Sequence, residues 1–218
     1  MKKILIILPI IYLSTGCTHY KVGVNGFTPT GTTLQIPQYS SVYVVKDSNA
    51  PNPIFEKEIA EKIQKLLNSR GHSVAAYDKA NFYLLFQYAI DSGRTKTGVM
   101  PVYQPGGTAT MNTFSSYGGM SYSTIQTPGY TTYVPYTKTT YTRWLTLNLI
   151  DGTAYRESKK VEPLWIGEVT SSGSCSDLRE VINYMLIAAF EHFGENTKKR
   201  VTETLLSSDK RAKLLTEP

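Results

Sequence analysis

The sequence predicts a two-layer α+β domain, in which a mixed sheet of about five strands has two helices on one face. In RWLTLNLID, three leucines (Leu145, Leu147 and Leu149) alternate with polar residues, which is the period of a half-buried strand. From Leu178 to Phe193, apolar residues recur at the spacing of an amphipathic helix. A second helical pattern follows the strand-like run SVYVVK. The predicted order is strand, helix, two strands, insert, two strands and helix.

The first half of this order begins with a strand over Ser41–Lys46. Asn52 is a candidate N-cap and Pro53 suits a first helical position, so a helix is predicted to begin there. It extends to Arg70, and Gly71 supplies a left-handed stop. Its apolar stripe is Phe55, Ile59, Ile63, Leu66 and Leu67. A short strand over His72–Tyr77 and a long one over Asn81–Asp91 follow; the second is apolar on both faces, as in the centre of a sheet.

The second half continues from the alternating leucines into a turn region that contains Asp151-Gly152. The run LWIGEV, Leu164–Val169, is predicted to pair antiparallel with the leucine strand. Ser174–Asp177 offers capping side chains for the last helix, which ends at Gly194. The domain therefore covers 41–194. We expect the basic remainder, 195–218, to be a frayed helix or a disordered tail.

The N-terminus has the order basic, apolar, small that is typical of an export signal. Lys2 and Lys3 precede ten uncharged residues, Ile4–Leu13. As a helix this run is about 15 Å long, roughly half of the ~30 Å core of a bilayer. We therefore expect a cleaved signal over 1–16 rather than a membrane-spanning anchor.

Cys17 directly follows Ser-Thr-Gly, and this stretch resembles the lipobox of bacterial lipoproteins. The resemblance implies cleavage after Gly16 and a lipid on the Cys17 thiol, so the membrane partner is reached through a lipid anchor. Because Thr18 follows rather than Asp, we expect the outer membrane rather than the inner one, with the domain facing the periplasm. The Gly-, Thr- and Pro-rich stretch 17–40 is interpreted as a flexible tether.

A low-complexity insert occupies about 93–140, and within it the 41 residues from Thr97 to Thr137 contain no Asp, Glu, Lys, Arg or His. One interpretation is a flexible insertion, because such a composition buries little apolar surface. The other is a tyrosine-studded surface for binding or self-association, whose Thr-rich run extends the following strand. The candidate partner-binding residues are Tyr122, Tyr130, Tyr133 and Tyr136.

Four stretches in this order resemble the bacterial lipoproteins of domain of unknown function 4136. They are IAEKIQKLLNSRGH, KANFYLLFQYAI, LTLNLID with LWIGEV, and LREVINYMLIAAFEHF. The resemblance implies an α+β envelope domain of undetermined function. The resemblance does not supply an activity, and we expect neither an enzymatic activity nor a cofactor.

The remaining composition narrows the function classes. The net charge of +6 falls to +4 when Lys2 and Lys3 leave, and an exported chain seldom meets nucleic acid, so no nucleic-acid partner is expected. Three separated histidines and Cys175 give no metal-ligand pair at useful spacing. We expect a non-enzymatic envelope protein that contacts another envelope protein. A peptidoglycan or anionic-glycan binder is the alternative, and a thiol enzyme using Cys175 is a lesser one; the oligomeric state stays open.

Overall fold

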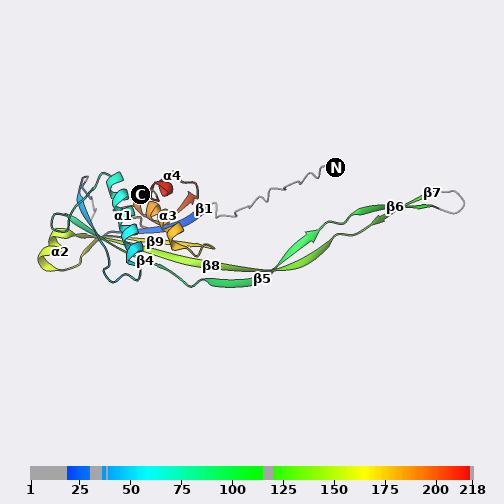
Figure 1. Cartoon of the computed structure of the whole chain (residues 1–218), viewed down its shortest axis with the longest axis horizontal. Coiled ribbons are helices and arrows are strands. Elements are labelled where there is room, and N and C mark those ends of the chain that lie inside the picture. Colours follow the sequence, from blue (N-terminus) through cyan, green and yellow to red (C-terminus); the bar gives the residue numbers. More distant parts are fainter. Residues whose placement is uncertain (1–18, 30–35, 38, 115–119, 217–218) are drawn as a thin grey trace, which may run out of the picture. The chain divides into compact units, whose positions relative to one another are not determined.

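The computed structural model describes residues 19–29, 36–37, 39–114 and 120–216. The predicted signal, Gly16 and Cys17 lie outside these residues. The chain forms two compact units. Unit 1 comprises residues 1–92 and 141–218, and unit 2 comprises Gly93–Thr140 (Figure 1).

Unit 1 contains both strands and helices, whereas unit 2 contains strands alone among its described residues. In chain order they are β1 (His19–Phe27), β2 (Ser41–Val45), α1 (Pro53–Ser69), β3 (Ser73–Val74), β4 (Phe82–Ile90), β5 (Arg94–Gln104), β6 (Thr108–Phe114), β7 (Met120–Gln126), β8 (Tyr130–Asp151), α2 (Gly152–Ser158), β9 (Pro163–Gly173), α3 (Leu178–Glu191), β10 (Val201–Leu206) and α4 (Lys210–Leu214).

The main sheet is mixed, which confirms the predicted α+β class. Its strand order is β10-β1-β9-β8-β4-β2-β3, and β5 pairs with β8 to complete eight strands. β2 runs parallel to β3 and β4, while the other pairs are antiparallel. The prediction of about five strands was too low, chiefly because it omitted β1 and β10.

β1 corrects the interpretation of 17–40 as a tether. This strand lies between β9 and β10, and Tyr20, Val22 and Val24 are buried beneath α3. The alternate residues, Lys21 and Asn25, lie on the opposite face, so HYKVGVNGF has the period of a strand despite its glycines. Of the predicted tether, 30–35 and Gln38 lie outside the described residues.

The C-terminal segment corrects the prediction of a frayed or disordered tail. β10 pairs with β1 along six residues, and α4 packs on α3. Leu205, Ala212 and Leu215 are buried in the main core. These apolar residues are far apart in the sequence from the strands and helix that cover them.

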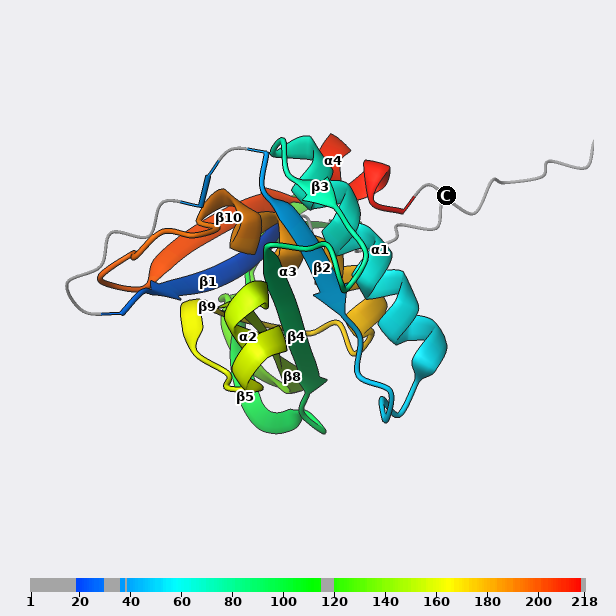
Figure 2. The same cartoon turned by 90° about the vertical axis from the view of Figure 1, so that its left-hand side faces the viewer.

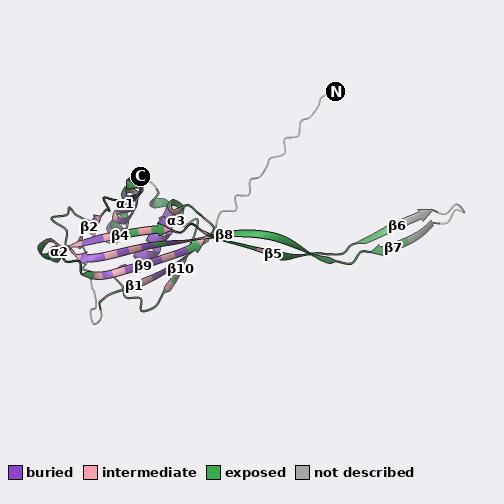
Figure 3. Cartoon of the chain, turned by 90° about the horizontal axis from the view of Figure 1, so that it is seen from below, coloured by how far each residue is buried: buried purple, intermediate pink, exposed green. Residues whose placement is uncertain are grey.

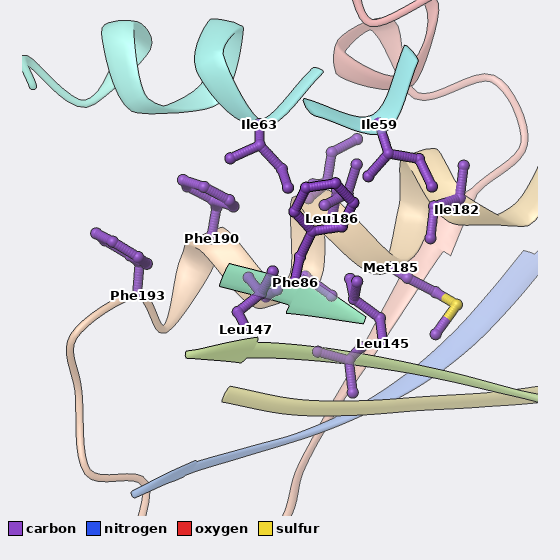
Figure 4. Close-up of a cluster of buried hydrophobic side chains, with 14 of the residues drawn as sticks. Ile59, Ile63, Phe86, Leu145, Leu147, Ile182, Met185, Leu186, Phe190 and Phe193 are labelled. Atoms are coloured by element: carbon purple, nitrogen blue, oxygen red, sulfur yellow. The ribbon is translucent and has the colours of Figure 1, made fainter. Parts of the chain in front are cut away.

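The main core lies between one face of the sheet and the helices α1 and α3, as predicted (Figure 2). Figure 4 shows Ile59 and Ile63 of α1 gathered with Leu186 and Phe190 of α3 in the layer that covers the strands. Leu145, Leu147 and Leu149 are all fully buried there, which confirms the predicted strand face. Every residue of α3 from Val181 to Phe190 is buried, because the sheet, α1 and α4 surround this helix.

A smaller cluster lies on the other face of the sheet and corrects one further prediction. The region after Asp151 is the helix α2 rather than a turn, and the Asp151 carboxylate caps it by accepting the Ala154 N–H at 2.9 Å. Tyr155 of α2 packs on Tyr83 and Ile150. The strand β4 is therefore apolar on both faces, as predicted.

The predicted ends of α1 are confirmed in detail. The Asn52 side chain accepts the Phe55 N–H at 3.1 Å, and Pro53 is the first helical residue. Gly71 adopts φ +84°, the left-handed conformation expected after a helix. Among the described residues no helix has both the length and the apolar character needed to span a membrane.

Unit 2 is built from two ladders. β5 pairs with the first half of β8, from Arg94↔Thr140 to Gln104↔Tyr130, and β6 pairs with β7. Its described side chains are mostly exposed, in contrast to the buried positions of unit 1 (Figure 3). The Thr-rich run does extend the following strand, since β8 continues from Tyr130 to Asp151.

Candidate functional site

The first candidate region is the end of the sheet where β1 begins. His19 is two residues beyond Cys17 in the sequence. An extended chain spans at most about 3.6 Å per residue, so Cys17 is at most roughly 7 Å from the first residue of the strand. The same end of the sheet contains Gly173 of β9 and Tyr141 of β8, which are directly paired. A lipid on Cys17 would hold this end of unit 1 close to a membrane surface.

Three polar side chains meet at this end: Tyr20 of β1, Cys175 before α3, and Glu180 in the first turn of α3. The Tyr20 hydroxyl donates a short hydrogen bond to the Glu180 carboxylate. The Cys175 Sγ donates to Glu180 Oε2 at 3.3 Å, and the Tyr20 ring stacks on Tyr184 at 4.0 Å between centroids. Burial and the neighbouring carboxylate raise the pKa of Tyr20 far above its ordinary value.

Cys175 has the environment of a protonated thiol. Burial raises its pKa, and the Glu180 carboxylate raises it further, although a hydrogen bond with the Asp177 backbone acts in the opposite direction. His72 and His192 are engaged elsewhere: the His72 ring packs against Phe193, and His192 contacts Glu203 at 3.0 Å. The arrangement is unfavourable for a thiolate nucleophile.

Arg143 of β8 holds the loop before α3 through a side-chain hydrogen bond. Its side chain is 1% exposed, and its guanidinium donates to the Cys175 carbonyl oxygen. Its Nε has no hydrogen-bond partner in the described part of the chain. Arg143 shares the parity of Leu145, Leu147 and Leu149, so the alternation alone points it into the core. Arg143 was not among the residues predicted from the sequence, although this alternation predicts its burial.

The second candidate region is unit 2, which carries the predicted tyrosines. Tyr130, Tyr133 and Tyr136 lie on β8 with exposures of 58%, 65% and 48%. Because neighbouring residues of a strand face opposite ways, Tyr130 and Tyr136 share one face and Tyr133 lies on the other. Tyr122 lies on β7, but its side chain is outside the described residues. The candidates therefore do not form a single patch.

Tyr136 has an additional structural role. It is paired with Gly98, and its ring covers that glycine so closely that a Cβ there would lie 2.9 Å from the ring. Tyr103 covers Gly129 in a similar way. These contacts use part of the aromatic surface to support the ladder, which leaves Tyr130 and Tyr133 as the freer candidates.

The β5–β8 ladder of unit 2 has basic residues at one end and is uncharged over the rest of its length. Lys96 is directly opposite Lys138, and Arg94 lies two residues away; all three are exposed. Beyond them the exposed side chains are uncharged, and they include the apolar Val99, Met100, Val102 and Val134. An exposed apolar surface of this kind is typical of an interaction site.

No group of three or more His, Cys, Asp or Glu side chains in the described part of the chain is arranged to hold a metal ion. The candidate regions thus offer contact surfaces, aromatic rings and hydrogen-bonding groups.

Comparisons with solved structures give distant similarities. A PDZ domain protein from Parabacteroides distasonis has 12% identity and a TM-score of 0.42; the match covers 86% of this chain but 39% of that one. A variant of PelC from Paraburkholderia phytofirmans, solved as a dodecamer, has 16% identity and a TM-score of 0.39, with 80% and 99% covered. A second PelC dodecamer has 16% identity and a TM-score of 0.38, with 77% and 94% covered. At TM-scores below 0.5 these likenesses carry no conclusion about function.

No curated protein matches the chain. The family described as "Domain of unknown function (DUF4136)" matches residues 27–193, which include β2 to α3 and all of unit 2. Most of β1, together with β10 and α4, lies outside this range. The match covers well over half of the sequence, and the chain therefore belongs to the DUF4136 family.

Proposed function

We propose that this chain is a non-enzymatic, lipid-anchored protein of the bacterial cell envelope that uses unit 2 to contact another envelope protein. The observation that carries the proposal is the surface of unit 2. Its strands come largely from a stretch of 41 residues that contains no charged side chain, and the paired strands carry exposed apolar groups. Such a surface is costly to leave in water, so a partner that covers it would stabilise the complex.

The anchor is supported by the position of Cys17. The lipobox-like stretch ends at Cys17, and β1, the first described strand, begins at His19. Two or three acyl chains hold a protein stably on a bilayer, whereas one chain does so only reversibly. With almost no spacer, the lipid would keep unit 1 against the membrane, with the outer membrane and a periplasmic domain as the proposed location.

The test is in-cell photo-crosslinking from unit 2. A photoreactive residue replaces Tyr130 or Tyr133, and the matched control carries it at Val161, which is 53% exposed in unit 1. We expect both unit 2 positions to capture the same protein, identified by mass spectrometry, and the control to capture none. Absence of a shared product, or the same product from Val161, would overturn the proposal. Incorporation of labelled palmitate, lost in Cys17→Ser, tests the anchor separately.

A second candidate function is binding to peptidoglycan or an anionic glycan. It is favoured by the basic residues Lys96 and Lys138 at one end of the β5–β8 ladder. Like charges directly opposite each other in a ladder are unfavourable, and an anionic polymer at Lys96 and Lys138 would relieve their repulsion. This candidate predicts salt-sensitive pelleting with cell wall. Pelleting should fall in the Lys96→Gln/Lys138→Gln variant and persist in a Lys57→Gln/Lys65→Gln control on α1. Equal pelleting by both variants would exclude it.

A further inference from the structure

The strand β4 has a free edge over its second half. β2 pairs with β4 only as far as Val45↔Leu85, whereas β4 continues to Ile90 and is paired there only with β8. Among the described residues no backbone hydrogen bond joins Gln87–Ile90 to the neighbouring loop, Asp47–Asn52. One row of backbone N–H and C=O groups is thus available to another extended chain.

A pocket of about 460 Å³ surrounds this edge. One wall is the Asp47–Asn52 loop with the first turn of α1, and the other is β4 with β8. Gln87 and Ala89 line it from one face of the sheet and Phe86 and Tyr88 from the other, so the pocket wraps around the edge. Its size falls within the roughly 300–1,000 Å³ of small ligand sites, enough for one or two side chains.

The pocket contains an uncompensated negative charge. Glu56 is 4% exposed, and its Oε1 accepts the Asp47 N–H at 2.9 Å. The Glu56 carboxylate also accepts a hydrogen bond from the Tyr88 hydroxyl; burial, followed by this carboxylate, raises the pKa of Tyr88 to about 12. Neither Glu56 nor Asp47 has an ion-pair partner among the described residues. A buried carboxylate without a cation favours a cationic ligand.

Trp144 adds an aromatic surface to the same pocket, on the face of the sheet that carries Gln87 and Ala89. It is paired with Ala89 on the neighbouring strand, lines the same pocket, and is 41% exposed. The other tryptophan, Trp165, is fully buried and donates to the Glu195 carbonyl at 3.0 Å. An exposed indole beside a free sheet edge offers apolar surface to a bound segment.

We propose that this edge pocket binds an extended segment of a partner protein, which pairs with Gln87–Ile90 and places a lysine or arginine side chain beside Glu56. Main-chain hydrogen bonds to the edge supply affinity, and the acidic pocket supplies specificity for a cation. The site lies wholly within unit 1 and does not depend on the contact proposed for unit 2 or on the lipid anchor.

The test uses the mature full chain in detergent and blocked pentapeptides of the sequence Thr-Val-Lys-Val-Thr. Calorimetry measures affinity, and the backbone amide shifts of Tyr88 and Ile90, whose N–H groups face the free edge, report the location. We expect the lysine peptide to bind and to shift these amides. A peptide with norleucine in place of lysine, and one with N-methylated backbone amides, should each bind at least about tenfold more weakly. Equal binding by either of them, or no binding by the lysine peptide, would overturn the proposal.

The variants separate the pocket charge from general electrostatics. Glu56→Gln keeps an oxygen that accepts the Asp47 N–H, and Asp47→Asn changes an exposed residue, so both are compatible with the fold. Each variant should bind the lysine peptide more weakly, and for Glu56→Gln we expect the affinity to fall by about tenfold. The matched control is Glu61→Gln on the same helix, whose side chain is 57% exposed and pairs with Lys57. If Glu61→Gln weakens binding as much as Glu56→Gln, the assignment is wrong.

Discussion

Replacing Val24 by alanine tests whether β1 is an integral strand of the domain or part of a tether. Val24 is fully buried and lies between Val169 of β9 and Val201 of β10. Removing two carbon groups costs about 1.6 kcal/mol of burial at ~0.8 kcal/mol each. A residual cavity of ~25–50 Å³ adds about 0.6–1.2 kcal/mol at ~24 cal/mol per Å³. The expected loss in the free energy of unfolding is therefore about 2–3 kcal/mol.

Urea denaturation of the mature chain carrying Cys17→Ser measures this loss, with tryptophan fluorescence as the readout because Trp165 is buried. At about 2.5 kcal/mol per M, the midpoint should fall by about 1 M. The matched control is Lys21→Ala, an exposed position on the same strand, which should change stability by no more than about 0.5 kcal/mol. If Val24→Ala and Lys21→Ala have the same midpoint, β1 is not part of the cooperative fold and the packing argument fails.

Two further predictions concern the region before α3. The Asp177 carboxylate accepts the Arg179 N–H at 2.8 Å and caps α3, so Asp177→Ala should lower the free energy of unfolding by about 1 kcal/mol. Ser176→Ala is the control, and an equal effect of both would show that the cap contributes nothing. Burial, together with Glu180, raises the pKa of Cys175, so iodoacetamide at about pH 8 should label it more slowly than glutathione. Glu180→Gln should lower this pKa and speed labelling; labelling of the unaltered chain as fast as that of glutathione would contradict the assignment.

The elements that could be predicted from sequence are those whose signal is local. The alternation at Leu145, Leu147 and Leu149 places each leucine in the core, because a strand that is buried on one face must have a period of two. The Asn52 cap and the Gly71 stop are defined by residues within a few positions of the helix ends.

The elements that were missed depend on pairing over long distances. β1 pairs with β9 and β10, which lie more than 130 residues further along the chain. Its sequence, HYKVGVNGF, has three strong apolar positions among glycines and polar residues, and composition alone favours a loop. The glycines have a structural reason at this place: a Cβ at Gly23 would meet the Arg200 guanidinium, and one at Gly26 would meet the Glu195 carbonyl. That reason becomes visible only when the C-terminal segment is folded beside β1.

The candidate sites show the same division between local and long-range information. Sequence identified the tyrosines of unit 2, but their three-residue spacing puts Tyr133 opposite to Tyr130 and Tyr136. Glu56 had no sequence signal, because an acidic residue in the first turn of a helix is commonly a solvated partner of the helix dipole. Its burial arises because Tyr88, from the far end of β4, closes over it.

The position of β1 in the sheet also bears on how the proposed anchor would work. Were β1 an edge strand, it would be held by one ladder, and a lipid pulling on its first residue could peel it away. Instead β1 is hydrogen-bonded on both sides, to β9 and β10, and its inward side chains are covered by α3. Separating it requires breaking two ladders and exposing Val22 and Val24 together. A lipid on Cys17 would therefore act on one of the best-secured strands of unit 1, so the short link between Cys17 and His19 would restrict the orientation of the whole unit at the membrane.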